Sequence, residues 1–393
     1  MVKVKSLIRL CVFLTVCILA GSFPGACALP GDEAANHYSA SERKRQMQAE
    51  DTSSWYYYSM LTAKERIWYE DIYLTLKNME TDRELYPGNI ADIGIDGLER
   101  IFQCVMGDHP EIFYVDGYTY AHYSRGGKVI KITYSGNYTM DRDTKNVTEA
   151  KLKSRANYIL ADLKEDATDY EKVRFVYEYV IRHTTYERDS VDNQNICSVL
   201  LHGKSVCQGY AKTVQYLLLL CGVDSTLVTG TVYNGEGHAL NLVKIDGEYY
   251  YVDATWGDAS YQSEATGEEV SYLPAINYEY LCVDTDTIEL THKLDSPVPL
   301  PDCKAKSANY YVMEGAYFTE YDEDTLKAYI QKQKDLGKKE IGMKCADLGT
   351  YQTFYQELIG KQKIFSYLSG NEKKVAYSTD DRKYSLTFWL VNE

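Results

Sequence analysis

The sequence has no Cys-x-x-Cys pair, no internal repeat and no excess of basic residues, and each absence excludes a class of protein. Its ten cysteines are widely spaced, so we expect neither a zinc knuckle nor a disulfide-dense scaffold. The 42 Lys and Arg are outnumbered by 57 Asp and Glu, which gives a formal net charge of −15. This balance argues against nucleic acid as a partner and against adsorption to anionic lipid.

Residues 1–28 have the pattern of a bacterial export signal. Lys3, Lys5 and Arg9 precede the uncharged run LCVFLTVCILAGSF, and small residues around Cys27 offer a cleavage site. We therefore expect a secreted or otherwise extracytoplasmic protein. Association with the cell surface is the alternative, through an uncleaved signal or a weak lipid anchor at Cys27, although FPGAC is a poor match to a lipobox.

The 393 residues are enough for two or three compact units, and composition suggests where they divide. A polar, charged stretch follows the signal, and DSPVPLPDC marks a boundary with three prolines in five residues. We expect a flexible linker at 29–54, an α+β unit at 55–145, a second unit at 146–294, a proline-rich linker at 295–303 and a small α/β module at 304–393.

The stretch GKSVCQGYAKTVQYLLLLCG, residues 203–222, places a cysteine at the start of a predicted helix. Apolar residues recur at helical spacing after Cys207, and Gly222 is placed to end the helix. Unpaired N–H groups and the dipole at a helix N-terminus favour a thiolate. Small neighbours would leave room for a substrate carbonyl. Cys207 is therefore a candidate nucleophile, with a structural thiol as the alternative.

The stretch GHALNLVKIDGEYYYVDATW, residues 237–256, predicts two strands joined by an Asp-Gly turn. If Ile245 pairs with Glu248, His238 and Asp253 lie on one face as diagonal neighbours, about 7–8 Å apart between Cα atoms. The carboxylate could then orient the imidazole. Asp258 is a rival for that role, but it lies past the strand. The order Cys–His–Asp is that of a thiol acyl-transfer site.

These two stretches resemble the transglutaminase-like superfamily, a branch of the papain-like thiol enzymes. YEKVRFVYEYVIRHTTYE resembles the helix that precedes the active-site helix, and the resemblance covers about residues 150–260. It implies an α+β core in which a helix bearing the cysteine packs against an antiparallel sheet. It also implies that Cys207 is the nucleophile, His238 the base and Asp253 the residue that orients the base.

One feature of papain-type enzymes is missing from the sequence. These enzymes place a Gln a few residues before the cysteine as an oxyanion donor, and LLHGKSV has none. The backbone N–H of Cys207 is one expected donor. Trp256, Tyr210 and Gln208 are candidates for the cleft or for the second donor, although each is also a candidate for simple packing.

We expect no metal and no cofactor. No stretch resembles a calcium site, and a helix would separate Cys207 from Cys221 by about 21 Å, too far to share one ion. His202 is expected in an exposed loop, and His292 lies beyond the region of resemblance, so neither is assigned a role.

The expected function is cysteine-dependent acyl transfer on protein or peptide amides, including those of the cell envelope. A thioacyl-enzyme gives a crosslink when an amine accepts the acyl group, and hydrolysis by a protease or deamidase when water accepts it. The sequence leaves both open. A third reading, from another class, is an inactive surface protein that binds peptide or polysaccharide, which the 38 tyrosines would suit.

Overall fold

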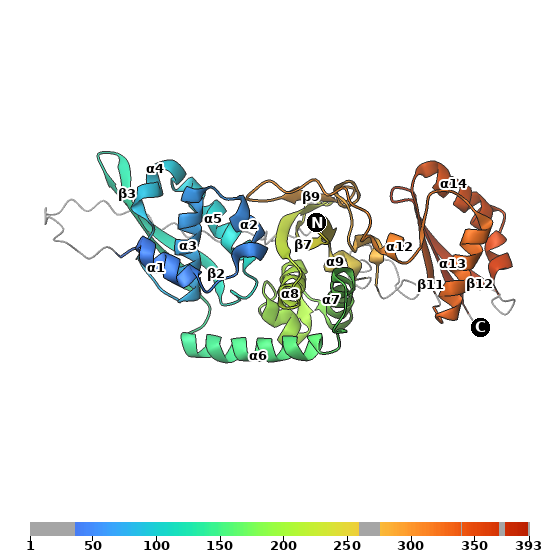
Figure 1. Cartoon of the computed structure of the whole chain (residues 1–393), viewed down its shortest axis with the longest axis horizontal. Helices are drawn as coiled ribbons and strands as arrows, with labels where there is room; N and C mark the ends of the chain where they lie inside the picture. The colour runs from blue at the N-terminus through green and yellow to red at the C-terminus, as the bar shows by residue number, and fades with distance from the viewer. Residues whose placement is uncertain (1–35, 259–275, 339, 369–373, 392–393) are drawn as a thin grey trace, which may run out of the picture.

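The computed structural model describes residues 36–258, 276–338, 340–368 and 374–391, and within them the predicted α+β class is confirmed (Figure 1). The predicted export signal, with Cys27, and the start of the predicted linker lie outside the described residues. Among the described helices, none combines the length and the apolar character needed to cross a membrane.

The first part of the chain combines helices with a three-stranded antiparallel sheet of order β1-β3-β2. Its longest helix begins after Thr62, whose hydroxyl and the Glu65 carboxylate form a reciprocal capping box. The elements are η1 (Thr52–Ser54), α2 (Tyr56–Met60), α3 (Ala63–Lys77), β1 (Arg83–Glu84), η2 (Pro87–Asn89), α4 (Ile90–Ile93), α5 (Asp96–Asp108), β2 (Val115–Arg125) and β3 (Lys128–Tyr138).

The prediction of a flexible linker at 29–54 is wrong from residue 36 onward. Helix α1 (Ala40–Met47) occupies this segment and begins at a capping box on Ser39. The Arg43 guanidinium is buried and lies 2.8 Å from the Asp71 carboxylate. The polar composition of the segment hides this long-range ion pair, which fixes the segment to α3.

In the middle part, α8 packs against a four-stranded antiparallel sheet of order β8-β7-β6-β9, and α7 packs on α8. The predicted division at 145/146 falls inside α6, which runs along one side of the first and middle parts (Figure 1). The elements are α6 (Arg142–Leu160), α7 (Asp169–His183), β4 (Thr185–Tyr186), the π-helical turn η3 (Ser198–His202), β5 (Lys204–Ser205), α8 (Cys207–Leu220), β6 (Ser225–Val232), β7 (Gly237–Ile245), β8 (Glu248–Val252), α9 (Ala254–Gly257), η5 (Tyr278–Tyr280), α11 (Thr285–Ile288) and β9 (His292–Asp295).

The predicted hairpin register is confirmed. Strands β7 and β8 pair from Ile245↔Glu248 to Asn241↔Val252, with Asp246 and Gly247 at positive φ in the turn. The ladder stops at Val252 because the next residue, Asp253, is the N-cap of α9. The chain therefore leaves the sheet at Asp253.

The last part forms a separate small layer of helices on a four-stranded sheet of order β10-β11-β13-β12, in which only β10 and β11 are parallel. Its apolar cluster is its own, whereas one continuous cluster joins the first and middle parts. The elements are α12 (Tyr310–Met313), β10 (Tyr317–Phe318), α13 (Glu323–Asp335), β11 (Glu340–Cys345), α14 (Leu348–Tyr355), η6 (Gln356–Gly360), η7 (Lys363–Tyr367), β12 (Lys374–Asp380) and β13 (Ser385–Val391).

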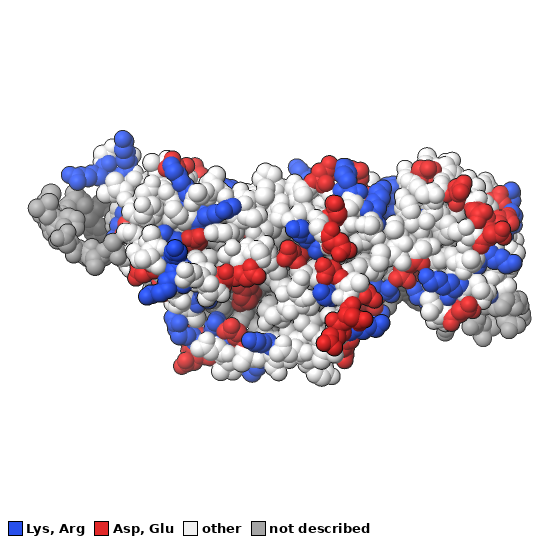
Figure 2. Space-filling view, viewed as in Figure 1, with Lys and Arg blue, Asp and Glu red and all other residues white. Residues whose placement is uncertain are grey.

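Charged side chains do not gather into one broad basic field on the face shown in Figure 2. Basic residues are interspersed with acidic ones along the whole length of that face. The described residues of this face therefore show no extended cationic track.

Candidate active site

Cys207 is the first residue of α8, as its sequence context predicts. The residue before it, Val206, is extended and provides no side-chain cap, so no side chain of the N-cap residue covers the first N–H groups of the helix. Cys207 is 5% exposed and packs with Ala211, Leu227 and Ala239. The sulfur therefore lies at a helix N-terminus in a narrow, mostly apolar setting.

The start of α8 is fixed by two buried serines. The hydroxyls of Ser198 and Ser205 lie 2.7 Å apart, and the Ser205 hydroxyl donates to the Asn193 carbonyl at 3.1 Å. A Cβ at Gly209 would lie 2.0 Å from the Ser205 oxygen. Small residues beside Cys207 are predicted to leave room for substrate, but at Gly209 serine oxygens fill the space that a side chain would occupy. Its role is close packing of the helix start.

His238, in β7, lies between the cysteine and the aspartate. Its Nε2 is 2.8 Å from Asp253 Oδ2, and the ring also hydrogen-bonds the Cys207 side chain. Because Nε2 is engaged by the carboxylate, Nδ1 is the nitrogen available to the sulfur. The three residues predicted from the sequence thus meet in space.

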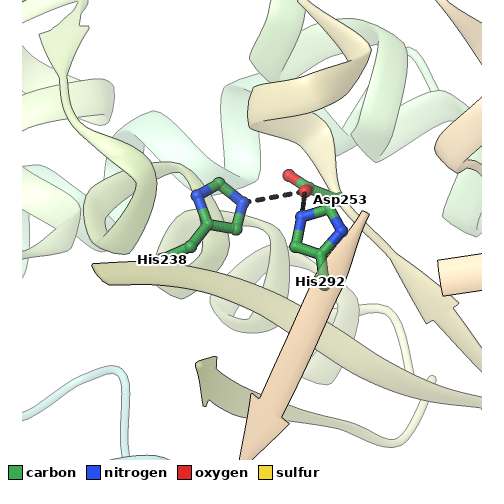
Figure 3. A group of neighbouring side chains, drawn as sticks. All are labelled: His238, Asp253 and His292. Carbon is green, nitrogen blue, oxygen red and sulfur yellow. Dashed lines mark hydrogen bonds and ion pairs between the residues drawn. The ribbon is translucent and has the colours of Figure 1, made fainter. Parts of the chain in front are cut away.

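Asp253 is the N-cap of α9, and its two oxygens have different partners. Oδ1 accepts the backbone N–H groups of Thr255 and Trp256, both at 3.0 Å. Oδ2 faces His238 at 2.8 Å and His292 at 3.1 Å (Figure 3). The cap explains why the carboxylate is held rigidly at the end of β8.

The electrostatics of this pair are dominated by burial and mutual attraction. Burial lowers the pKa of His238, but the charge and hydrogen bond of Asp253, together with Cys207, raise it to about 10. Burial works in the opposite sense on Asp253, and the two histidines hold its pKa below the usual value. At neutral pH the ring is therefore protonated and can give a proton to a leaving amine.

His292 is the site residue that the sequence reasoning missed. It lies in β9, which joins the sheet by pairing Val232 with His292, and its side chain is 1% exposed. No short-range pattern identifies β6 as the neighbour of β9, so this contact has no signal in the sequence. His292 also lies beyond the region of resemblance, about residues 150–260, so the sequence analysis assigns it no role.

The His238, Asp253 and His292 donor atoms lie within 4.8 Å of one another, and theirs is the one grouping in the described chain that could approach a metal ion. However, the carboxylate oxygen already contacts both Nε2 atoms, and His292 Nδ1 lies 2.8 Å from the Thr291 hydroxyl. These partners match a hydrogen-bonded network, and we interpret the group in that way.

Trp256, a candidate for the cleft, packs over the two histidines. Its ring centroid is 4.8 Å from that of His292 and 6.2 Å from that of His238. The indole therefore covers the imidazole–carboxylate network and limits the access of water to it.

Tyr210 and Gln208, the other cleft candidates, engage different groups. The Tyr210 hydroxyl lies 3.0 Å from both the Thr184 carbonyl and the Asp258 carboxylate. The Gln208 amide donates to the Gln194 carbonyl at 3.3 Å. Asp258 thus accepts a hydrogen bond from Tyr210, whereas Asp253 is the carboxylate that contacts the His238 imidazole.

Comparison with known proteins places the match on this same region. The transglutaminase-like superfamily matches residues 156–254. Kyphoscoliosis peptidase from Homo sapiens is 31% identical over 122 residues, which are 27% of this chain and 18% of that protein. The Mus musculus protein is 27% identical over 129 residues, 28% of this chain and 20% of the relative. The chain thus spans about a fifth of the length of these curated relatives.

A solved structure of a TGase is also similar, with 16% identity over 36% of this chain and 44% of the other, at a TM-score of 0.26. The matched family region contains the cysteine, the histidine of β7 and the aspartate that caps α9. Residues 156–254 therefore belong to the transglutaminase-like superfamily.

Proposed function

We propose that the protein is a cysteine-dependent acyltransferase that acts on amides of proteins or peptides through a thioacyl-enzyme. The observation that carries this proposal is the meeting of Cys207, at the start of α8, with an imidazole that Asp253 holds from the other side. A nucleophile, a base and an orienting carboxylate in this order form the arrangement used for acyl transfer.

In the first half-reaction, the Cys207 thiolate attacks the amide carbonyl carbon and a C–S bond forms. The C–N bond then breaks, and the His238 imidazolium gives its proton to the leaving amine. The uncapped N–H groups at the start of α8, with that of Cys207 first, can stabilise the oxyanion. In the second half-reaction, His238 takes a proton from the acceptor, which attacks the thioester and releases the sulfur.

The acceptor decides between two outcomes of the same chemistry. The low exposure of Cys207 and the indole over the histidines support restricted entry of water, which favours an amine acceptor and a crosslinked product. Peptidase or deamidase activity is the second candidate, and the name of the curated relatives favours it. In that case water accepts the acyl group.

The proposed substrates lie outside the cytoplasm. The basic start, apolar run and small residues of positions 1–28 support export, and the negative charge supports a protein or peptide substrate over a nucleic acid. Amide-bearing proteins and peptides of the cell envelope are the substrates we propose.

The test is incubation of the protein with a Gln-containing peptide and a labelled primary amine, followed by mass spectrometry. We expect amine-modified peptide, with deamidated or cleaved peptide as the mark of hydrolysis, and no product from Cys207→Ala. Absence of all products and of a trapped thioester would contradict acyl transfer and leave an inactive binding protein.

A matched thiol provides an internal control that needs no substrate. We expect iodoacetamide at pH 6 to label Cys207 well before Cys221, because burial raises the pKa of the Cys221 thiol to about 11. Equal, slow labelling of both residues would argue against an activated nucleophile.

A further inference from the structure

His292 reaches the site from the strand on the far side of β6. On β6, Gly230 pairs with His238 of β7, and Val232 pairs with His292 of β9. Positions 230 and 232 point to the same face because side chains alternate along a strand. The two histidines therefore lie on one face of the sheet, two strands apart, and their ring centroids are 5.0 Å apart.

Gly230 is what allows β9 to lie so close. A Cβ at this position would be 2.3 Å from the Lys293 carbonyl oxygen, a backbone atom that cannot move away without displacing the strand. Residue 293 directly follows His292. The absence of a side chain on β6 thus brings the imidazole of β9 to within reach of the carboxylate.

The almost completely buried His292 ring has a polar atom close to each nitrogen, although Nε2 contacts the carboxylate at ion-pair distance without the alignment of a hydrogen bond. Nε2 lies 3.1 Å from Asp253 Oδ2, Nδ1 lies 2.8 Å from the Thr291 hydroxyl, and the ring packs on Trp256. A buried polar ring without partners would cost free energy, and an apolar residue would fill the space at lower cost. The imidazole is therefore placed for its polar contacts.

We propose that His292 is a positioning residue that contacts the same oxygen of Asp253 as His238 does, fixes the carboxylate in line with the catalytic imidazole and moderates its negative charge. This inference rests on the proposed function for the reaction that it serves. His292 acts through Asp253, and His238 remains the group that exchanges protons with substrate.

The consequence concerns the proton on His238. A carboxylate whose Oδ2 also lies 3.1 Å from the His292 ring nitrogen attracts the His238 proton less strongly, so the imidazolium releases it more readily to the leaving amine. Without His292 the full charge of Asp253 faces His238, which then holds its proton to a higher pH. The ring is also less firmly oriented, because one contact to the carboxylate is gone.

The tyrosines around the Asp253 carboxylate do not titrate in the pH range where His238 loses its proton. Tyr177 of α7 and Tyr280 of η5 face Asp253, and burial together with the Asp253 charge raises the pKa of each hydroxyl well above 10. Cys207 of α8 faces the opposite side of the His238 ring. A change in the pH profile after substitution of His292 therefore reports on the imidazole–carboxylate pair.

The experiment compares the full chain with His292→Leu and His292→Gln. Leu removes both polar contacts, whereas Gln keeps an N–H donor of similar reach. For each protein the rate of Cys207 alkylation by iodoacetamide is measured against pH, and acyl transfer is measured with the Gln peptide and labelled amine. The upper inflection of the alkylation profile reports loss of the His238 proton.

For His292→Leu we expect that inflection to move upward by about one pH unit, the effect of removing one close polar contact from a charged group. We expect acyl transfer to fall about tenfold as the ring loses its alignment. His292→Gln should recover most of both losses. Circular dichroism and thermal unfolding show whether each variant is folded.

Two outcomes would overturn the inference. If the wild type and both variants share one alkylation profile while only thermal stability falls, His292 fills space and nothing more. If the wild type binds equimolar zinc tightly and His292→Leu abolishes that binding, His238, Asp253 and His292 are zinc ligands. The alkylation profile needs no substrate, so a shifted profile without peptide products supports the inference and contradicts the proposed function alone.

Discussion

One carboxylate oxygen of Asp253 accepts backbone N–H groups, and the other contacts the histidines of the candidate site. Oδ1 is occupied by two N–H groups of α9, so the carboxylate cannot rotate without losing the helix cap. Oδ2 is therefore presented to His238 in a fixed direction. A structural cap and a proposed catalytic role are combined in a single side chain, and substitution at this position affects both.

Asp253→Asn tests this arrangement. An amide that turns its NH₂ group toward His238 offers a donor where the ring needs an acceptor, which favours the wrong tautomer and removes the charge that stabilises the imidazolium. We expect kcat/KM for acyl transfer to fall about 10³–10⁴-fold, as for the equivalent change in a Ser-His-Asp triad.

The matched control is Asp258→Asn, because Asp258 is the other buried aspartate close in sequence and contacts Tyr210. An Asn oxygen can still accept from that hydroxyl, so we expect less than a tenfold loss of activity. A larger loss for Asp258→Asn than for Asp253→Asn would mean that the orienting residue was assigned wrongly.

At the same scale, the contacts of Asp253 show what the sequence could provide. His238 was predictable as its partner because a two-residue turn fixes the register of neighbouring strands. His292 was not, because β9 joins the sheet through β6, far away in sequence. Alternation of side chains gives the face of a strand but not the identity of its neighbour.

Among the elements, the start of α8 determines where the proposed nucleophile lies. The helix was predictable from apolar spacing and from Gly222, and it runs from Cys207 to Leu220. The π-helical turn η3 before it was not, nor was the contact between its Ser198 and Ser205. Close packing between a turn and a helix leaves no periodic signal in the sequence.

Gly209→Ala tests the packing of this element. The added Cβ would lie 2.0 Å from the Ser205 oxygen and 2.7 Å from that of Ser198, so the helix start must shift. We expect the free energy of unfolding to fall by about 1–3 kcal/mol, measured by urea denaturation. Acyl transfer should fall as well, because Cys207 moves with the first turn.

The control is Gly349→Ala in α14, an exposed helical position where the Cβ would meet nothing nearer than 3.4 Å. Here we expect a gain of about 0.5–1 kcal/mol, the usual advantage of Ala over Gly in a helix. Equal stability changes for the two variants would show that the Ser198–Ser205 contact does not constrain the helix start.

The whole molecule is divided less evenly than composition suggests. The first and middle parts share one apolar cluster, and hydrogen bonds cross between them: Tyr57 donates to the Leu227 carbonyl and Gln215 to the Gly107 carbonyl, each at 2.7 Å. Changes in composition indicate where a chain turns polar, but they say nothing about which surfaces pack together. The predicted domain series therefore says nothing about the core that the first and middle parts share.

The last part is attached differently. Its apolar cluster is separate, and several of the contacts that join it to the middle part are polar, such as Lys344 with Glu279 at 2.7 Å and Lys383 with the Tyr280 hydroxyl at 2.8 Å. The rings of Tyr278 and Tyr310 also stack across this boundary. Interfaces of this polar kind transmit less stability than a shared apolar core. We therefore expect two unfolding units, one of them containing both the first part and the proposed active site.

Asp108→Ala tests this division. Asp108 is buried at the end of α5 and accepts the N–H groups of Tyr57 and Tyr58 and the Tyr69 hydroxyl, at 2.9–3.0 Å. Alanine leaves the two backbone N–H groups without an acceptor, whereas the Tyr69 hydroxyl keeps His109 Nε2 at 3.0 Å and the Thr226 hydroxyl of β6, which also contacts Asp108, keeps the Gly107 carbonyl at 3.1 Å. We expect a loss of about 3–5 kcal/mol from the larger unit. Although the substitution lies in the first part, Cys207 should lose its fast labelling at a correspondingly lower urea concentration.

A substitution of the same type in the last part provides the control. Asp347 caps α14 by accepting the Thr350 N–H at 2.8 Å, and its replacement by Ala should cost about 1 kcal/mol in the last part alone. Labelling of Cys207 in urea should then follow the wild-type curve. If Asp108→Ala instead unfolds the first part while Cys207 keeps its fast labelling, the shared apolar cluster does not couple the two parts, and the proposed active site depends on the middle part alone.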